Sequence, residues 1–201
     1  MTENPKGEIR LSGVAASPGI VMAPGFLYLK QELDIPMYFV SGSQIERELE
    51  RFDDAILQTR QQIQEIRTDI AVNLGEDEAK IFDAHLLVLE DIALIGETHE
   101  QIKQTGYNAE YCFHEVSQKY IDFFKNIDDE FLKERVNDIR DVTRRLLSNL
   151  LGHSETGKLR VPEMVEGCVL VSKDLHPSDA AGLHSVGLKG LVTDTGGMTS
   201  H

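Results

Sequence analysis

Tryptophan is absent from the 201 residues, and there are only two cysteines. Cys112 and Cys168 share no CxxC spacing, which excludes both a disulfide framework and a paired-cysteine metal motif. We expect the two thiols to behave as small apolar side chains. Apolar runs are too short to span a bilayer, and the first ten residues lack the apolar region of a secretory signal. The sequence therefore predicts a cytoplasmic protein.

Basic residues are scarce: 20 Lys and Arg stand against 34 Asp and Glu, for a formal net charge of −14. Nucleic-acid binding requires cationic side chains that displace counterions from phosphates, so this balance argues against that function. Residues 43–152 hold 24 acids and 13 bases, and most of the excess therefore belongs to this segment. Such a segment attracts a basic partner over long distances.

Proline is absent from the same segment and glycine is rare in it. Ser43, followed three residues later by Glu46, predicts a capping box at the start of a helix. Apolar residues at helical spacing then predict four helices, over about 43–72, 77–103, 109–127 and 129–150. Gly152 is a suitable C′ residue for the last one. The short connections predict an antiparallel four-helix bundle.

The flanking residues, 1–40 and 153–201, hold most of the glycine and proline. Two Pro-Gly pairs near the N-terminus predict turns between short strands. Near the other end, the apolar runs 168–171 and 191–193 predict strands, and Ser178 or Asp179 is expected to cap a short helix between them. Strand, helix and strand predict a crossover unit. We therefore expect an α+β chain in which one discontinuous α/β domain surrounds the helical domain, 43–152.

Seven histidines are the first candidates for chemistry, but none forms a zinc-type pair at i, i+4. His201 stands out because it follows the sequence TDTGGMTS. Gly196 and Gly197 permit a loop whose backbone amides approach an anion, and Thr199 or Ser200 could cap a following helix. This context suits a nucleophilic histidine that carries phosphate. A glycine turn with an incidental histidine remains the alternative.

The segment TDTGGMTSH resembles the active-site signature of the phosphoenolpyruvate-utilising enzymes. Three further segments, SGVAASPGIVMAPG, FDAHLLVLED and DDEFLKERVNDIRDVTRRLLSNLLG, are similar to the N-terminal region of the enzyme I family of the sugar phosphotransferase system, the phosphoenolpyruvate–protein phosphotransferases. The resemblance runs in order from about Leu11 to His201. It implies a helical bundle that binds the phosphocarrier protein HPr, inserted into a swivelling phosphohistidine domain that is incomplete in this chain.

By this resemblance, His201 accepts the phosphoryl group of phosphoenolpyruvate at Nε2 and passes it to a histidine of HPr, the first step of sugar uptake. Gly196, Gly197, Thr199 and Ser200 are expected to support the phosphate. The resemblance also implies a set of HPr-binding positions on the second and fourth predicted helices: Glu76, Asp77, Ile81, His85, Leu87, Val88, Asp91, Leu94, Leu132 and Arg135.

The chain departs from the family pattern in two places. Ile92 and Ala93 stand where enzyme I commonly has acidic residues, so part of the acidic docking rim is expected to be missing. His176 and Ala180 stand where threonines are often found, and the second of those threonines can hydrogen-bond the active imidazole.

The chain ends at His201, and we expect it to be roughly the first third of the enzyme. The resemblance places the phosphoenolpyruvate site, its Mg²⁺ and the homodimer interface beyond this chain, with no metal site of its own. We therefore expect a monomeric fragment that binds HPr but does not use phosphoenolpyruvate. Phospho-HPr should also label it poorly, because the terminal carboxylate beside His201 opposes an incoming phosphate.

Three alternatives remain. A dikinase or synthase relative is disfavoured because nothing here has the length or composition of a nucleotide-grasp domain. A nitrogen-regulatory relative is disfavoured by the short leader before Leu11. A non-catalytic adaptor with an acidic helical face predicts that His201→Ala leaves every activity unchanged.

Overall fold

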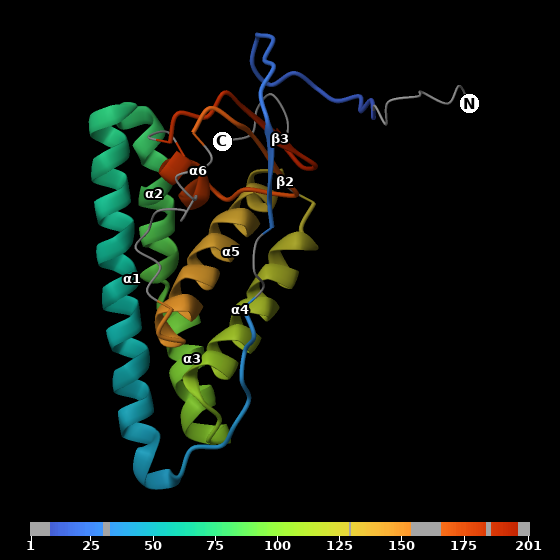
Figure 1. Cartoon of the computed structure of the whole chain (residues 1–201). Coiled ribbons are helices and arrows are strands. Elements are labelled where there is room, and N and C mark those ends of the chain that lie inside the picture. Colours follow the sequence, from blue (N-terminus) through green and yellow to red (C-terminus); the bar gives the residue numbers. More distant parts are fainter. Residues whose placement is uncertain (1–8, 30–32, 129, 154–165, 184–185, 197–201) are drawn as a thin grey trace.

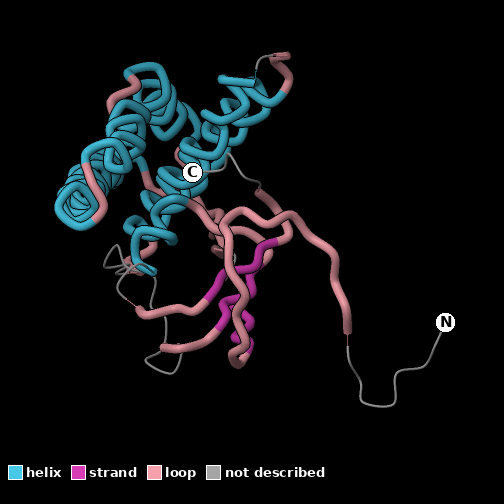
Figure 2. The backbone as a smooth tube through the Cα atoms, turned by 90° about the horizontal axis from the view of Figure 1, so that it is seen from above, coloured by secondary structure: helices cyan, strands magenta, loops and turns pink. Residues whose placement is uncertain are grey.

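A computed structural model describes residues 9–29, 33–128, 130–153, 166–183 and 186–196, with the side chains of 130–134 outside the description. It shows a long bundle of helices with a small parallel sheet near one end (Figure 1). Viewed along the bundle, the strands gather beside the helices and not among them (Figure 2). The expected α+β class is confirmed.

Five helices make up the bundle within the described residues. They are α1 (Ile45–Asn73), α2 (Glu76–Leu89), α3 (Ile92–Thr105), α4 (Ala109–Lys125) and α5 (Glu130–Leu150), and a 3₁₀ turn, η1 (Gly42–Gln44), precedes α1. Each helix has an apolar stripe that is stable only when another helix covers it. The stripes meet in one continuous core, whose largest fully buried side chains include Phe52, Ile63, Phe82, Phe113 and Leu146.

The second predicted helix, 77–103, is wrong as a single element, because the chain breaks between α2 and α3. The Oδ1 atom of Asp91 accepts hydrogen bonds from the backbone amides of Ala93 and Leu94, at 2.9 and 3.0 Å. Asp91 is therefore the N-cap of α3, where it satisfies two amides that have no intrahelical partner. The apolar spacing continues across the break, so periodicity alone gave no sign of it.

The ends of α1 and α5 test two further predictions. The predicted capping box at Ser43 is wrong: Ser43 lies within η1, and the N-cap of α1 is Gln44, without a side-chain capping bond. Gly152 is confirmed as the C′ residue of α5, with a φ of 70°. The amides of Gly152 and His153 donate to the carbonyls of Asn149 and Ser148, at 3.0 and 2.9 Å. This pair of bonds is a Schellman motif.

Three parallel strands form the sheet in the order β1 (Gly25–Tyr28), β2 (Val169–Ser172) and β3 (Gly190–Thr193). The helix α6 (Pro177–Leu183) connects β2 to β3, so the strand–helix–strand prediction is confirmed. Two details differ. Residues 9–24 contain no strand, and neither Ser178 nor Asp179 is the N-cap of α6, because His176 precedes Pro177. Asp179 instead accepts the His176 amide through Oδ2 at 3.0 Å.

A partly buried ion-pair network fixes the start of α4 against α1. Arg51 donates two hydrogen bonds to the carboxylate of Glu110, at 2.6 and 2.7 Å, and further bonds to Glu48 and to the Leu150 carbonyl. Glu48 also accepts the Ala109 amide at 2.8 Å, which satisfies the first turn of α4. Burial raises the pKa of Glu110, but hydrogen bonds from Arg51 and Asn108 outweigh it and hold that pKa below its ordinary value.

Asp91→Ala should lower the free energy of unfolding by about 1 kcal/mol, because it removes the N-cap of α3. Asp91→Asn should lower it much less, because asparagine caps a helix nearly as well. Urea unfolding followed by circular dichroism measures both. Equal losses in the two variants would mean that the charge of Asp91, and not its capping bonds, stabilises the helix.

The Glu110 carboxylate should make unfolding depend on pH. Its pKa is lower in the folded chain than in the unfolded chain, so its contribution is present above the ordinary value of 4.5 and is lost as the pH falls through the folded pKa. Glu110→Gln should flatten this dependence and cost roughly 2 kcal/mol at pH 7. The control is Glu50→Gln, an exposed acid of the same bundle. An unchanged pH profile in Glu110→Gln would contradict the assignment.

Candidate functional site

The loop that follows β3 is the first part of the predicted phosphohistidine signature. Its first residues are held by the loop that follows β2: the Asp194 amide donates to the Lys173 carbonyl at 3.2 Å, and the Thr195 hydroxyl donates to Asp174 Oδ1 at 3.0 Å. Thr193 donates to the Thr195 carbonyl at 2.6 Å. The chain therefore leaves β3 in a defined direction along the edge where the parallel strands end.

Gly196 comes next and has a φ of 110°, a conformation that side chains with a Cβ rarely adopt. This agrees with the expectation that the loop needs glycine at this point. Gly197, Thr199, Ser200 and His201 lie outside the described residues, so their predicted roles remain predictions.

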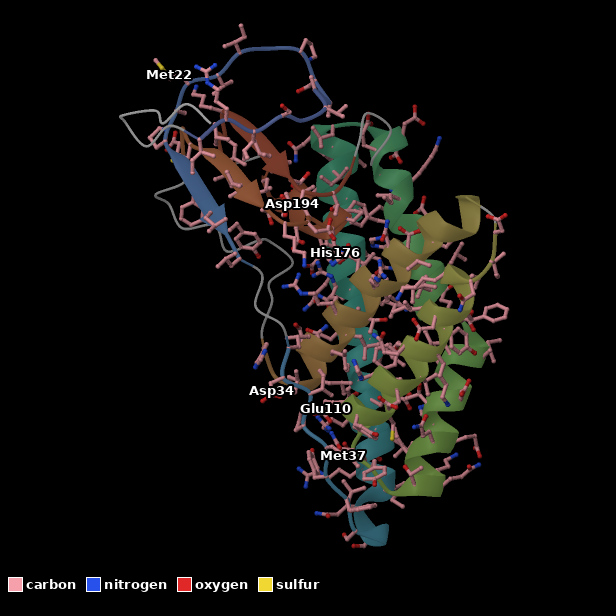
Figure 3. The ribbon with its side chains drawn as sticks, turned by 90° about the vertical axis from the view of Figure 1, so that its right-hand side faces the viewer. Met22, Asp34, Met37, Glu110, His176 and Asp194 are labelled. Carbon is pink, nitrogen blue, oxygen red and sulfur yellow. The ribbon has the colours of Figure 1, made fainter. Side chains whose placement is uncertain are left out.

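The helix α6 joins this sheet edge to the bundle. The Ser178 amide donates to Asp141 Oδ2 on α5 at 3.0 Å, and Arg144 Nη1 lies 3.4 Å from Asp179 Oδ1. His176 and Asp194 lie at this junction of strands and helices (Figure 3). His176 is half-buried before α6, whereas Ala180, at the second position where the family often has threonine, is exposed.

His85 does not lie on the surface, although the resemblance implies that it contacts a partner. Its side chain is 1% exposed and sits between two carboxylates of α5, with Nε2 3.4 Å from Asp138 Oδ1 and Nδ1 4.0 Å from Asp141 Oδ2. Neither ring nitrogen has a hydrogen-bond partner among the described residues. Leu94 is likewise buried in the core. In this structure both residues support the predicted docking surface from beneath.

Other predicted docking positions do form surface. Leu87 is 59% exposed near the end of α2, Glu76 and Asp77 are exposed at its start, and Asp91 is exposed just after it. Ile81 and Val88 are half-buried and pack against the core. Arg135 is half-buried on α5, and the side chain of Leu132 is outside the description. Ile92, which stands in place of an acid, is 87% exposed.

Neighbouring cations balance several of the exposed acids of α2. Arg67 on α1 pairs with Asp83 at 2.7 Å and with Glu76 at 3.1 Å. Lys80 pairs with Asp77 at 2.6 Å, and its hydrogen bond lowers the pKa of that carboxyl. Because these charges are locally paired and exposed to solvent, each contributes little to stability. Leu87 and Ile92 are therefore exposed apolar side chains on a stretch of chain whose acids are partly neutralised.

Reasoning from the sequence missed the residues that join the two parts of the site. Asp141 and Arg144 hold α6, and Lys173 and Asp174 hold the loop after β3. The one signal available was Asp141 itself, a carboxylate within the apolar stripe of α5, where an unpaired charge is costly to bury. The partners of Lys173 and Asp174 depend on strand register, which the sequence pattern does not specify.

Two searches of the described residues were negative. No group of three or more His, Cys, Asp or Glu side chains is placed to hold a metal ion. Within the same ranges of the chain, no helix has the length and apolar character needed to cross a membrane.

Comparison with known proteins matches most of the chain to two described families. Residues 12–135 match the family described as PEP-utilising enzyme, N-terminal, and residues 164–201 match the PEP-utilising enzyme, mobile domain. The chain is 42% identical over 191 residues to a phosphoenolpyruvate-protein phosphotransferase of Listeria innocua, and 39% identical over 192 residues to that of Bacillus subtilis. Both alignments cover 95% of this chain, but only 32% and 33% of the respective relatives.

Solved structures agree with this assignment. A solution structure of an Enzyme I protein (nEIt) superposes with a TM-score of 0.73 at 35% identity, over 94% of this chain and 75% of that one. The N-terminal domain of Enzyme 1 - Nitrogen superposes with a TM-score of 0.64 at 25% identity, over the same shares. The chain spans about a third of the length of the curated relatives it matches, and it belongs to the family of phosphoenolpyruvate-utilising enzymes.

Proposed function

We propose that this chain is the phosphoryl-carrying and partner-binding part of a phosphoenolpyruvate–protein phosphotransferase. The observation that carries the proposal is the ordered match of both the N-terminal and the mobile-domain families, the second ending at His201. The start of the signature supports it, because hydrogen bonds fix Asp194 and Thr195 and Gly196 has a positive φ ahead of the residues that lead to the histidine.

In this proposal the neutral imidazole of His201 attacks the phosphorus of phosphoenolpyruvate through Nε2. A P–N bond forms, the P–O bond to the enol oxygen breaks, and the enolate takes up a proton to become pyruvate. A histidine nitrogen of HPr then attacks the same phosphorus and releases His201. Gly196 and Gly197 leave room for backbone amides to approach the phosphate, and Thr199 and Ser200 add hydroxyl donors.

Docking of HPr is proposed for the exposed part of α2 and the start of α3, together with Arg135 on α5. Leu87 and Ile92 supply the apolar contact, and Glu76, Asp77 and Asp91 supply negative charge. Opposite charge raises the association rate more than it raises affinity. Since part of the rim is paired internally or replaced by Ile92, we expect binding here to depend more on apolar contact than on charge.

We further propose that residues 43–152 form the partner-binding domain, and that residues 1–40 and 153–201 form the phosphohistidine domain. The parent enzyme is proposed to be a cytoplasmic homodimer. In this proposal, other parts of the enzyme hold phosphoenolpyruvate and Mg²⁺.

Titration of the isotopically labelled chain with HPr should shift the amide resonances of α2 and α3. Leu87→Glu should weaken binding by at least tenfold, because it places a charge in the apolar contact. The control is Leu57→Glu, a similar side chain, 62% exposed, on α1. Equal weakening by both variants, or shifts confined to other helices, would contradict the docking assignment.

His201→Ala in the full-length parent enzyme should abolish acid-labile labelling by radioactive phosphoenolpyruvate. His153→Ala, an exposed histidine that follows α5, should leave labelling unchanged. The 201-residue chain alone should take no label from phosphoenolpyruvate with Mg²⁺. Undiminished acid-labile label on the His201→Ala enzyme would refute the proposal.

A further inference from the structure

A cavity of about 430 Å³ lies between the sheet and the bundle. Its walls come from the ends of β1 and β2 and the residues that follow them, and from one face each of α4 and α5. In open parallel sheets, ligands bind at the carboxyl ends of the strands, and this cavity occupies that edge. Its volume lies within the range of small-molecule sites.

Cationic side chains gather at this cavity, although the chain as a whole has a net charge of −14. Arg140 and Arg144 on α5 line it together with Lys173 after β2, and His114 on α4 adds an imidazole. Among the described residues of the lining, Asp174 is the one acid, and it accepts the Thr195 hydroxyl. Arg144 lies 3.4 Å from Asp179, and Arg140 donates to the Asn137 amide oxygen at 3.3 Å. The lining therefore carries an excess of positive charge.

Much of the remaining wall is apolar, with Leu33, Ile35, Ile121 and Leu147 among its residues, and Tyr28, Gln118 and Ser172 add polar groups. Thr143 also lines the cavity; it is 5% exposed, and its hydroxyl has no hydrogen-bond partner in the described part of the chain. An apolar wall with cations fits an anion that carries an apolar body.

The cavity is also connected to the loop after β3. Lys173 and Asp174 contribute to its lining, and the same two residues hold Asp194 and Thr195 by hydrogen bonds. A ligand that contacts the Lys173 ammonium group would therefore act on the residues that fix the direction of this loop. Such coupling works in both directions, because linked binding equilibria are reciprocal.

We propose that this cavity binds a small organic anion, a phosphate or carboxylate group on a compact apolar body, and that its occupancy is coupled to the loop after β3. The site is distinct from the HPr-docking surface on α2 and α3, and it does not depend on the phosphoryl-transfer proposal.

The test uses the labelled 201-residue chain and four probes: phenyl phosphate, benzoate, inorganic phosphate and benzyl alcohol. Phenyl phosphate and benzoate should give saturable shifts at the amides of Thr143, Lys173 and Asp174. Inorganic phosphate should bind at least tenfold more weakly, because it lacks the apolar body. Equal binding of neutral benzyl alcohol would overturn the anion assignment, and a lack of saturable shifts with either aromatic anion would overturn the site.

Variants locate the charge that binds the probe. Lys173→Gln, at an exposed position, and Arg140→Gln should each weaken phenyl phosphate binding by about tenfold, which corresponds to 1.4 kcal/mol. The control is Lys119→Gln, which removes a cation of α4 that pairs with Glu97 and is not in the lining. Spectra of the free variants show whether each one is folded. Unchanged affinity in both folded cavity variants would overturn the site.

The coupling has its own readout. Saturating phenyl phosphate should shift the amide of Thr195 in the native chain, and Asp174→Asn should reduce that shift while binding persists. A Thr195 amide that does not move while Lys173 saturates would overturn the coupling.

Discussion

The position of the sheet on the bundle depends on the hydrogen bond between the Ser178 amide and the Asp141 carboxylate. It is 4% exposed, and it accepts the Ser178 amide at the first turn of α6, so a buried anion and a buried donor satisfy each other. If either group lost the other, it would be left unsatisfied away from water, at a cost of about 1–3 kcal/mol or more. This bond therefore restricts where α6, and with it β2 and β3, can sit on α5. His85 approaches the same carboxylate from α2, so three elements meet there.

Acidic and basic side chains occupy different parts of the molecule. Acids dominate the outer faces of the helices, where Arg60, Arg67 and Lys80 pair with several of them. Cations instead gather at the inner junction, where Arg140, Arg144 and Lys173 line one cavity. A single polypeptide of strongly acidic composition thus carries acids with paired cations on its outer helices and a group of cations around one cavity at the end of its sheet.

Much of the fold could be predicted from the sequence, because most of it follows from local periodicity. The stripes of α1, α4 and α5, the Gly152 terminus and the crossover through α6 all have spacing signals within one element. The break at Asp91 escaped prediction, since a capping aspartate interrupts the backbone without interrupting the apolar spacing. The prediction at Ser43 was wrong for the opposite reason. The serine and glutamate of a capping box are present, but the chain there forms a 3₁₀ turn.

The candidate site was less accessible to sequence reasoning. The importance of Gly196 was visible in the run of glycines, and the structure gives it the expected positive φ. The burial of His85 was not visible, because a histidine on a helix can face either way until its neighbours are known. Asp141, Arg144, Lys173 and Asp174 act across elements, so their roles emerge only once strand register and helix packing are set.

The pairing of β1 with β2 has a consequence for how the molecule is made. Phe26 lies beside Leu170, although all five helices of the bundle separate them along the chain. During synthesis β1 is made first, but it cannot pair until β2 has been made. The helices in between can fold earlier, because most of their contacts join residues close in sequence. Within this chain, the sheet is therefore completed only after the helices have been made, and the loop after β3 gains its direction at that point.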